Sequence, residues 1–421
     1  MNTRSKKTSA FAASPRQSSH SQRKTAGRIV FLLAMIFFLS AAKAPAEILD
    51  LGLLPNGDLY STAMDVSANG QVVVGSTYDP FKYLAFHAFR WTPTDGMSSI
   101  GPLNGGPNSE AEATSADGSV VVGHAADGAA ANANRAFRWT QTTGMVSLGT
   151  LNGGAYSGAR DVSSDGSVVV GIAYDGLVAN NARAFRWTQA TGMVSLGVLS
   201  GGDHSNANGV SDDGNVVVGS STISTNYTWR AFRWTQATGM VSLGAINNGD
   251  HSEAIDTSAD GGVVVGHAKD GAANNTDRAF RWTQGDGMVS LGVLNGGNAS
   301  FAYGVSADGK VVVGESTCNT DAIDTYKSTD FRGFRWTQAT GMITVEQWLA
   351  ANGVSVGPEM TTSRASSVSA DGNTVAGYLT NGHAFLARLN SQSTSNLGGN
   401  TGTETNQTNL GGNTGTETNQ T

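Results

Sequence analysis

The stretch AFRWTQATGMVSLG at residues 184–197 and the pattern VSADGKVVVG at residues 305–314 recur along most of this 421-residue chain. The tryptophan of each Phe-Arg-Trp triplet stands at Trp91, Trp139, Trp187, Trp234, Trp282 and Trp336, so successive spacings are 48, 48, 47, 48 and 54 residues. Such a period is typical of supersecondary units that bury their apolar faces only against neighbouring copies. A degenerate seventh copy reads HAFL at residues 383–386. The sequence therefore predicts seven structural repeats.

Each repeat contains four short strand candidates. The first is an S-x-A-x-x-V/T-S run, as at residues 157–163, and it ends in an Asx-Gly pair that suits the positive φ of a tight hairpin. The second is a Val-Val-Val-Gly run, whose lack of alternation indicates cover on both faces. The third contains Phe-Arg-Trp, and the fourth is Met-Val-Ser-Leu-Gly, as at residues 193–197. Four antiparallel strands per repeat are expected.

Four strands in about 48 residues, repeated seven times, predict an all-β fold, a seven-bladed β-propeller. Residues 48–52 (ILDLG) resemble the fourth strand of a repeat, whereas the seventh repeat stops after residues 385–389 without one. We therefore expect the N-terminal strand to complete the last blade and close the ring. The alternative is a β-solenoid, which also has a fixed period but needs no matched halves at its two ends.

The two ends of the chain differ in composition from the repeats. Residues 1–46 combine a basic stretch, an apolar run at residues 29–42 and Ala44-Pro45-Ala46, the pattern of a signal peptide with its cleavage site. The repeat domain is expected over residues 47–390. Residues 391–421 form a polar, low-complexity tail, expected to be disordered, with two identical 13-residue copies at 396–408 and 409–421.

Charge and cysteine content limit the classes of partner. Residues 1–46 carry eight of the 26 basic residues and no acid, so the rest of the chain has 18 basic and 33 acidic residues, a net charge of −15. This balance argues against nucleic acid or an anionic membrane as partner. No later segment is expected to cross a membrane as a helix. The single cysteine, Cys318, cannot form an internal disulfide.

The sequence contains no motif for catalysis, cofactor binding or metal binding that would support an enzyme. In Asp203-His204-Ser205 and Asp250-His251-Ser252, neighbouring residues on a strand would point to opposite faces and could not form a relay. His124 and His267 each follow a Val-Val-Val-Gly strand, but no accompanying ligands are evident. The hairpin aspartates need no calcium ion to explain them. We expect no catalytic residues, no metal and no cofactor.

Two sets of repeated polar residues are expected to be structural. In the third strand Phe and Trp share one face by the period of two, so they should fill the core between blades and leave the arginine on the other face. A partly buried guanidinium needs a partner, and the hairpin aspartates or nearby carbonyls are the natural candidates. The arginines are Arg90, Arg138, Arg186, Arg233, Arg281 and Arg335, and the aspartates are Asp117, Asp165, Asp213, Asp260 and Asp308.

The repeats resemble the HAF repeat family of bacterial extracellular proteins, named for a His-Ala-Phe tripeptide that stands here at residues 87–89 and 383–385. Five other copies begin with arginine instead, at Arg135, Arg183, Arg230, Arg278 and Arg332. The resemblance covers residues 48–390. It implies an exported bacterial protein, often surface- or autotransporter-associated, and it carries no catalytic residues over.

The segments between the second and third strands are the most variable part of the repeat, at about residues 76–86, 124–134, 172–182, 220–229, 267–277 and 315–331. Variable loops on a repeated frame commonly form a binding face. We therefore expect a monomeric, secreted or cell-surface binding module for an unknown extracellular ligand, a glycan or a protein, with the periplasm as the alternative location. The candidate ligand-binding residues are Tyr227, Trp229, Tyr326 and Phe331.

Two other functions remain open at the level of the sequence. A polysaccharide hydrolase or lyase would need a pair of carboxylates converging on the loops or on the central channel, to which Glu315, Asp321 and Asp324 could contribute. A structural surface spacer would need no ligand at all.

Overall fold

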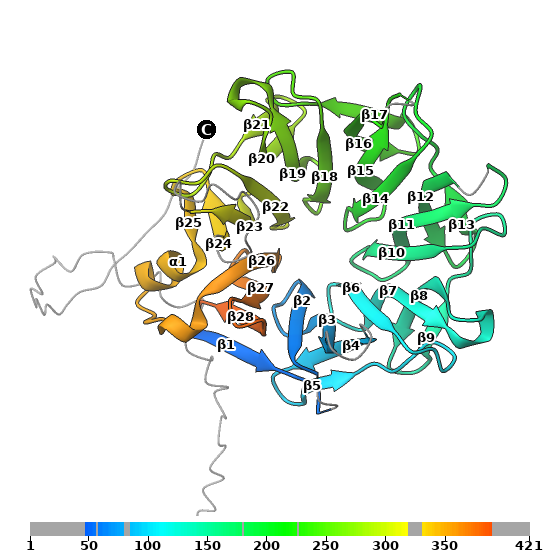
Figure 1. Ribbon diagram of the computed structural model, residues 1–421, viewed down its shortest axis with the longest axis horizontal. Coiled ribbons are helices and arrows are strands. Elements are labelled where there is room, and N and C mark those ends of the chain that lie inside the picture. Colours follow the sequence, from blue (N-terminus) through cyan, green and yellow to red (C-terminus); the bar gives the residue numbers. More distant parts are fainter. Residues whose placement is uncertain are drawn as a thin grey trace, which may run out of the picture. The chain divides into compact units, whose positions relative to one another are not determined.

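The computed structural model describes residues 47–55, 58–79, 85–178, 181–224, 227–318 and 331–389. The expected signal peptide, the tail from residue 391, Tyr326, Asp321 and Asp324 lie outside these residues. Seven four-stranded antiparallel sheets are arranged as blades around a central axis (Figure 1), so the predicted seven-bladed β-propeller is confirmed and the solenoid is excluded. Within the described part of the chain, no helix is long and apolar enough to cross a membrane.

The strands follow the repeat in order from the axis outward. Blade one contains β2 (Tyr60–Val66), β3 (Val73–Asp79), β4 (Ala85–Thr92) and β5 (Gly96–Ser99). Blade two contains β6 (Ser109–Thr114), β7 (Val120–Asp127), β8 (Ala133–Thr140) and β9 (Gly144–Ser147). Blade three contains β10 (Ser157–Val162), β11 (Val168–Asp175), β12 (Asn181–Thr188) and β13 (Gly192–Ser195).

The remaining blades repeat this plan. Blade four contains β14 (Ser205–Val210), β15 (Val216–Thr222), β16 (Trp229–Thr235) and β17 (Gly239–Gly244). Blade five contains β18 (Ser252–Thr257), β19 (Val263–Asp270), β20 (Thr276–Thr283) and β21 (Gly287–Ser290). Blade six contains β22 (Ser300–Val305), β23 (Val311–Thr317), β24 (Phe331–Thr337) and β25 (Gly341–Thr344). Blade seven contains β26 (Thr362–Val368), β27 (Thr374–Leu379), β28 (Ala384–Arg388) and β1 (Glu47–Gly52).

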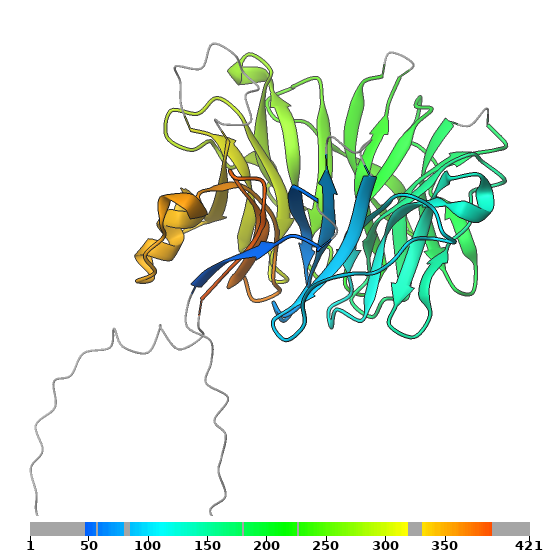
Figure 2. The ribbon, with the colours of Figure 1, turned by 60° about the horizontal axis from the view of Figure 1, so that its bottom comes forward.

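Blade seven is completed by the N-terminal strand, as the unmatched ends predict. Strand β1 pairs antiparallel with β28, with Ile48 opposite Ala387 and Asp50 opposite Phe385. Figure 2 shows β1 on the outer edge of this blade, beside the last strand of the chain. Two ion pairs reinforce the junction: Arg388 contacts Glu47, and His383 Nδ1 lies 2.9 Å from Asp50 Oδ2. The two ends of the domain therefore share one sheet.

The hydrophobic core lies between neighbouring blades rather than within any one blade. Phe137 and Trp139 of blade two pack against Val72, Val74 and Leu103 of blade one, and the same arrangement recurs around the ring. Phe137 is fully buried. Because each blade needs its neighbour to bury these rings, the fold depends on closure.

The hairpin between the first two strands of each blade carries the Asx-Gly pair. In blade two, Ser115 Oγ donates to Asp117 Oδ1 and accepts from Val120 N, and Gly118 N donates to Ser115 O at 2.9 Å. Gly118 has a φ of 72°, and a Cβ atom there would lie 2.3 Å from Val72 Cγ2 of blade one. Glycine is thus required both by the turn and by the close approach of the blades.

Two departures from the regular repeat lie between blades five and seven. The spacing of 54 residues reflects the segment between β23 and β24, residues 318–330. Between β25 and β26 the chain forms α1 (Val345–Ala351), which the sequence analysis missed, with a capping box made by Thr344 and Gln347. Its residues Val345, Trp348 and Leu349 are buried against blades six and seven. Short 3-10 turns occupy Gly128–Ala130, Gly271–Ala273 and Pro358–Met360.

Candidate functional site

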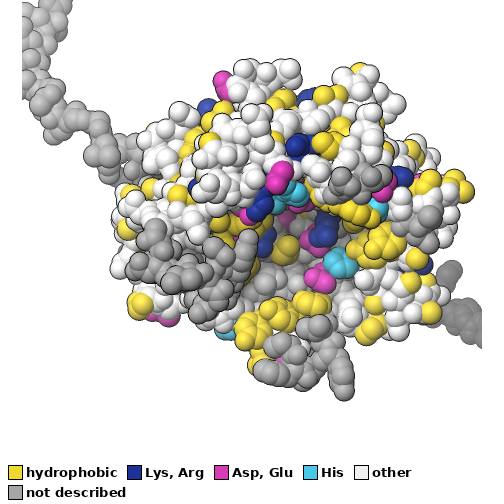
Figure 3. Space-filling model, turned by 45° about the horizontal axis from the view of Figure 1, so that its top comes forward, with side chains coloured by type: hydrophobic (Ala, Val, Ile, Leu, Met, Phe, Trp, Pro, Cys, Tyr) yellow, Lys and Arg dark blue, Asp and Glu magenta, His cyan; other side chains and the backbone are white. Residues whose placement is uncertain are grey.

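The innermost strand of every blade faces a central channel, and the two faces of the ring differ. On the hairpin face, defined by the Asx-Gly hairpins, a closed ring of seven backbone hydrogen bonds joins consecutive blades. The opposite face, here called the loop face, carries the connections between second and third strands. Figure 3 shows a hollow at the centre of one face, with acidic, basic and histidine side chains gathered around it. The described histidines lie at or near strand ends toward the loop face, so this hollow is the mouth of the channel there.

The channel cavity has a volume of about 330 Å³ and a mostly polar lining. Its polar lining residues are Asp65, Glu112, Arg160, Asp161, Asn208, Glu253, Asp256, Tyr303, Arg364, Ser366 and Ser367. All of them belong to the innermost strands, and neighbours such as Arg160 and Asp161 both line the channel because the strand register shifts between Ala159 and Asp161. Within the otherwise constant first strand of the repeat, these positions differ from blade to blade, so each blade presents different side chains to the channel.

Three aspartates of alternate blades, Asp65, Asp161 and Asp256, lie deeper in the channel. Each carboxylate accepts from the backbone N–H of the following residue and from a backbone N–H of the next blade; Asp161, for example, accepts from Val162 N and Val210 N, both at 2.7 Å. Burial raises the pKa of all three, that of Asp256 to about 7. The mutual repulsion of the carboxylates adds to the rise at Asp161. The three aspartates therefore link neighbouring blades by hydrogen bonds, and burial makes their ionised form unfavourable in the folded protein.

A buried arginine stands at the channel mouth on blade seven. The guanidinium carbon of Arg364 lies 3.4 Å from the centre of the Tyr303 ring, and Tyr303 Oη donates to Glu315 Oε1 at 2.8 Å. Arg364 Nε is buried without a hydrogen-bond partner among the described residues. An unsatisfied buried N–H on a cation is costly, so the side chain is suited to receive an acceptor from a ligand.

A groove of about 620 Å³ continues from Arg364 between blades seven and one. Its walls carry Tyr60, Tyr78 and Tyr378, and its other polar residues include Arg332, Thr361 and Thr380. Tyr60 and Tyr78 lie opposite each other on β2 and β3 and are stacked, with ring centres 5.2 Å apart. Phe86 extends this row, 5.1 Å from Tyr78. Flat aromatic surface, hydroxyl groups and cations therefore share one open groove.

The loops expected to form the binding face are shorter than predicted. Strands such as β7 continue four residues past their glycine, so the connection to β8 comprises only residues 128–132. Of the predicted ligand residues, Tyr227 is 60% exposed and lies 5.5 Å from the His204 ring between ring centres. Trp229 and Phe331 are instead the first residues of β16 and β24 and are half-buried. They lie on different blades, and no described contact brings them to a common site with Tyr227.

Of the carboxylates that the enzyme alternative would use, Glu315 is the one within the described residues. It accepts a hydrogen bond from Tyr303, which lines the channel. The pKa of Glu315 is raised by burial. The other carboxylates there, Glu112 and Glu253, were missed by the sequence analysis. The sequence does contain a signal for them, because they occupy variable positions of the otherwise constant S-x-A-x-x-V/T-S strand. Glu253 is the second residue of this pattern in its blade and Glu112 the fourth in its own.

The six Phe-Arg-Trp arginines each donate to a carbonyl of the next blade, the carbonyl of the glycine that follows the hairpin Asx. Five do so through Nε at 3.0–3.1 Å, as from Arg186 to Gly214 O, and Arg335 through a terminal nitrogen at 3.2 Å to Gly372 O. The aspartates accept from their own turn instead, and these bonds lower the pKa of Asp117, Asp165, Asp213, Asp260 and Asp308. The arginines therefore bind carbonyls rather than these carboxylates.

The ring and its charged channel define the class of protein. It is a seven-bladed β-propeller with a polar central channel whose lining residues differ from blade to blade. No protein-family model matches the chain, and no curated protein does. Among solved structures it is similar to TolB from Acinetobacter baumannii, at 12% identity and a TM-score of 0.44, over 66% of this chain and 63% of that one. It is also similar to a putative TolB from Agrobacterium tumefaciens, at 14% identity and a TM-score of 0.41, over 60% of this chain and 84% of that one. Similarities at this level do not bear on function.

Proposed function

We propose that this chain is an exported bacterial surface or secreted protein of the HAF repeat kind that binds an acidic glycan on its loop face. The observation that carries the proposal is the groove between blades seven and one, where three tyrosines and Arg364 line one cavity of about 620 Å³. Sugar rings stack on aromatic faces, their hydroxyl groups bond to threonines and tyrosines, and a uronate carboxylate pairs with a guanidinium.

The position of Arg364 favours an acidic over a neutral ligand. Its partner Tyr303 is engaged with Glu315, and its Nε has no acceptor within the described chain. A carboxylate in the groove would pair with the charge of the Arg364 guanidinium, since this residue lines the groove. The chain as a whole is acidic after residue 46, so the arginines of this groove are a local exception rather than part of a basic surface.

The test is binding of polyuronate oligosaccharides compared with neutral oligosaccharides of equal length, by isothermal titration calorimetry. Arg364→Met and Tyr378→Ala should each weaken binding of the acidic oligosaccharide by at least about tenfold, which corresponds to about 1.4 kcal/mol. Tyr174→Ala is the control, since Tyr174 is an exposed tyrosine in blade three, away from the groove, and its ring is tilted against that of Tyr156 with ring centres 5.2 Å apart. Equal binding by all variants, or no binding of any glycan, would contradict the proposal and favour the spacer.

The enzyme alternative is checked in the same incubation by measuring new reducing ends and unsaturated products. Burial raises the pKa of Tyr303, so this tyrosine does not serve as the base of a lyase. Release of new reducing ends or unsaturated products would favour the enzyme over the binding module.

A further inference from the structure

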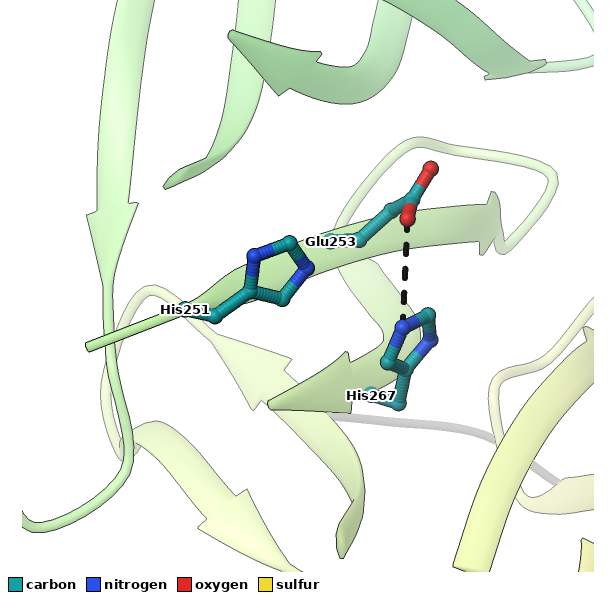
Figure 4. A group of neighbouring side chains, drawn as sticks. All are labelled: His251, Glu253 and His267. Carbon is teal, nitrogen blue, oxygen red and sulfur yellow. Dashed lines mark ion pairs between the residues drawn. The ribbon is translucent and has the colours of Figure 1, made fainter. Parts of the chain in front are cut away.

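Three potential metal ligands converge on blade five at the channel mouth. His251, Glu253 and His267 each offer a ligand atom, and these atoms all lie within 4.8 Å of one another. Figure 4 shows the two imidazoles and the carboxylate directed toward one another from β18, the residues just before it, and β19. Glu253 Oε2 and His267 Nε2 are 3.8 Å apart.

The backbone dictates this convergence. Glu253 and His267 are directly opposite in the register of β18 and β19. His251 precedes Glu253 by two residues, so it lies on the same side of the chain, and its carbonyl accepts from Lys269 N at 2.9 Å. The pairing of His251 with Glu253, two residues further along the strand, is not evident from the triplet Asp250-His251-Ser252 alone.

Neighbouring side chains position the Glu253 carboxylate and leave one of its oxygens free to bind a metal ion. Glu253 Oε1 accepts from Asn208 Nδ2 at 3.1 Å and lies 3.4 Å from Ser220 Oγ, which leaves Oε2 facing His267. The His267 ring packs edge-on against Phe301, with ring centres 5.1 Å apart. Outer contacts of this kind orient metal ligands in known sites.

Blade two provides an internal comparison, because it has Asn108, Glu110 and His124 at the same repeat positions. There a second carboxylate, Glu112, contacts the imidazole, so His124 lies within 3.4 Å of a carboxylate at both nitrogens. Blade five has Ile255 at the position of Glu112, and His267 Nδ1 is buried with no hydrogen-bond partner among the described residues. The His267 ring is therefore not clamped between carboxylates as His124 is.

The charge state agrees with the geometry. Burial lowers the pKa of both His251 and His267, so both imidazoles are neutral at neutral pH and have a free lone pair. In contrast, carboxylates raise the pKa of His124 to about 9, so a metal ion at that ring would first have to displace a proton.

We propose that His251, Glu253 and His267 bind one Zn²⁺ ion, with the fourth position open to water or to a ligand at the channel mouth. Two imidazoles and one carboxylate with an open position are a ligand set that Zn²⁺ accepts in tetrahedral geometry. At zinc–ligand distances of about 2.0–2.1 Å the ligand atoms lie about 3.3 Å apart, so the separations, which are now at most 4.8 Å, must contract by up to about 1.5 Å through side-chain rotation to complete the site. The site is separate from the groove between blades seven and one, so it stands or falls independently of glycan binding.

The experiment titrates the untagged, chelator-treated protein with zinc chloride at pH 7.5 by calorimetry, and with cobalt chloride by visible absorption. We expect one tight site per chain and the intense visible bands of four-coordinate Co²⁺. His251→Asn, which gives blade five the asparagine that blade two has at Asn108, should weaken Zn²⁺ binding by at least about 100-fold, since even an outer-shell change costs about 10–100-fold. His124→Asn is the matched control and should bind as the parent does.

A readout on the parent protein avoids dependence on how the variants fold. Zn²⁺ should shift the imidazole proton resonances of His251 and His267 in the NMR spectrum and leave those of His124 unchanged. Binding weaker than about 100 µM, which is about 5.5 kcal/mol, would overturn the proposal. So would unchanged affinity in both His251→Asn and Glu253→Gln, or resonance shifts confined to other histidines.

Discussion

The backbone N–H of Ala370 in the last blade donates to the carbonyl of Ala68 in the first at 3.1 Å, which closes a ring of seven hydrogen bonds on the hairpin face. The other six join Ala68, Ala116, Ser164, Asp212, Ala259, Ala307 and Ala370 in chain order. Closure thus occurs twice, here near the axis and again at the outer edge where β1 pairs with β28. Every blade has two neighbours.

Removing residues 47–53 should lower the melting temperature and promote aggregation. The deletion exposes the edge of β28 and uncovers the cluster that contains Leu51, Phe89 and Leu386. A variant that lacks residues 391–421 is the control and should melt as the parent does. Differential scanning calorimetry and light scattering measure both effects, and equal melting of the two deletions would show that β1 adds little to closure.

Replacing Arg186 by Met should cost about 1–2 kcal/mol of unfolding free energy. The substitution removes the donor to Gly214 O but leaves no carboxylate unpaired. The loss of unfolding free energy should therefore equal that of one hydrogen bond from a charged group. Gln189→Met, at an exposed position of the adjoining turn, should change stability by less than about 0.5 kcal/mol. Chemical denaturation measures both. A loss above about 4 kcal/mol at Arg186 would instead indicate an unpaired buried charge.

Replacing Gly166 by Ala should cost about 2–4 kcal/mol, because its φ is 72° and the new Cβ would lie 2.5 Å from Val120 Cγ2 of the neighbouring blade. Gly144→Ala separates the two causes: its φ is 64° but no atom lies within 4 Å, so only about 1 kcal/mol is expected. Adding Val120→Ala to Gly166→Ala should recover part of the loss. Equal costs at Gly144 and Gly166 would mean that blade contact contributes nothing.

The pH dependence of stability should flatten when Asp256 is replaced by Ala, the residue at the matching position of blade two. The pKa of Asp256 is raised by burial from 3.8 to about 7, so the folded state favours its protonated form. Its contribution to stability is therefore present below about pH 4 and is lost as the pH rises through about 7. Denaturation at several pH values should show a smaller decline between pH 4 and 8 in the variant.

Asp308→Ala is the control for this experiment. Hydrogen bonds and the Lys310 ion pair lower the pKa of Asp308, so its contribution is lost only as the pH falls through that lowered value. The variant should keep the slope of the parent between pH 5 and 8. An unchanged slope in Asp256→Ala would mean that this carboxylate is solvated.

His124 should titrate near pH 9. Burial alone lowers its pKa, but hydrogen bonds with Glu110 and Glu112 outweigh burial and raise it. Because the folded-state pKa exceeds the ordinary 6.5, this pairing stabilises the fold fully below pH 6.5 and ceases to do so as the pH rises through about 9. NMR titration of the His124 ring measures the value, and Glu112→Gln should lower it. A His124 pKa near 6.5 in the parent would show that the carboxylates do not hold the proton.

The candidate sites were only partly predictable from the sequence. The arginines were expected to bind hairpin aspartates or nearby carbonyls, and the structure shows the carbonyl of the hairpin glycine as acceptor. The sequence could not decide between the two, because every residue has a backbone carbonyl and no pattern distinguishes one from another. Similarly, Arg364 and Tyr303 come from different blades, 61 positions apart, and their contact depends on how two inner strands lean toward the axis. The helix α1 was missed because the repeat pattern ends before it.

The sequence by itself determined the number of blades, the four strands of each and the strand exchange at the ends, because these follow from short, repeated patterns of apolar residues and turns. Only the tertiary structure decided which variable side chains meet. His251, Glu253 and His267 form a cluster because strand register places them on one side of blade five, whereas the nearly identical blade two clamps its histidine between two carboxylates. The physical reason is that strand periodicity is a local property, while the spacing and charge balance around the channel arise from seven strands brought together by ring closure.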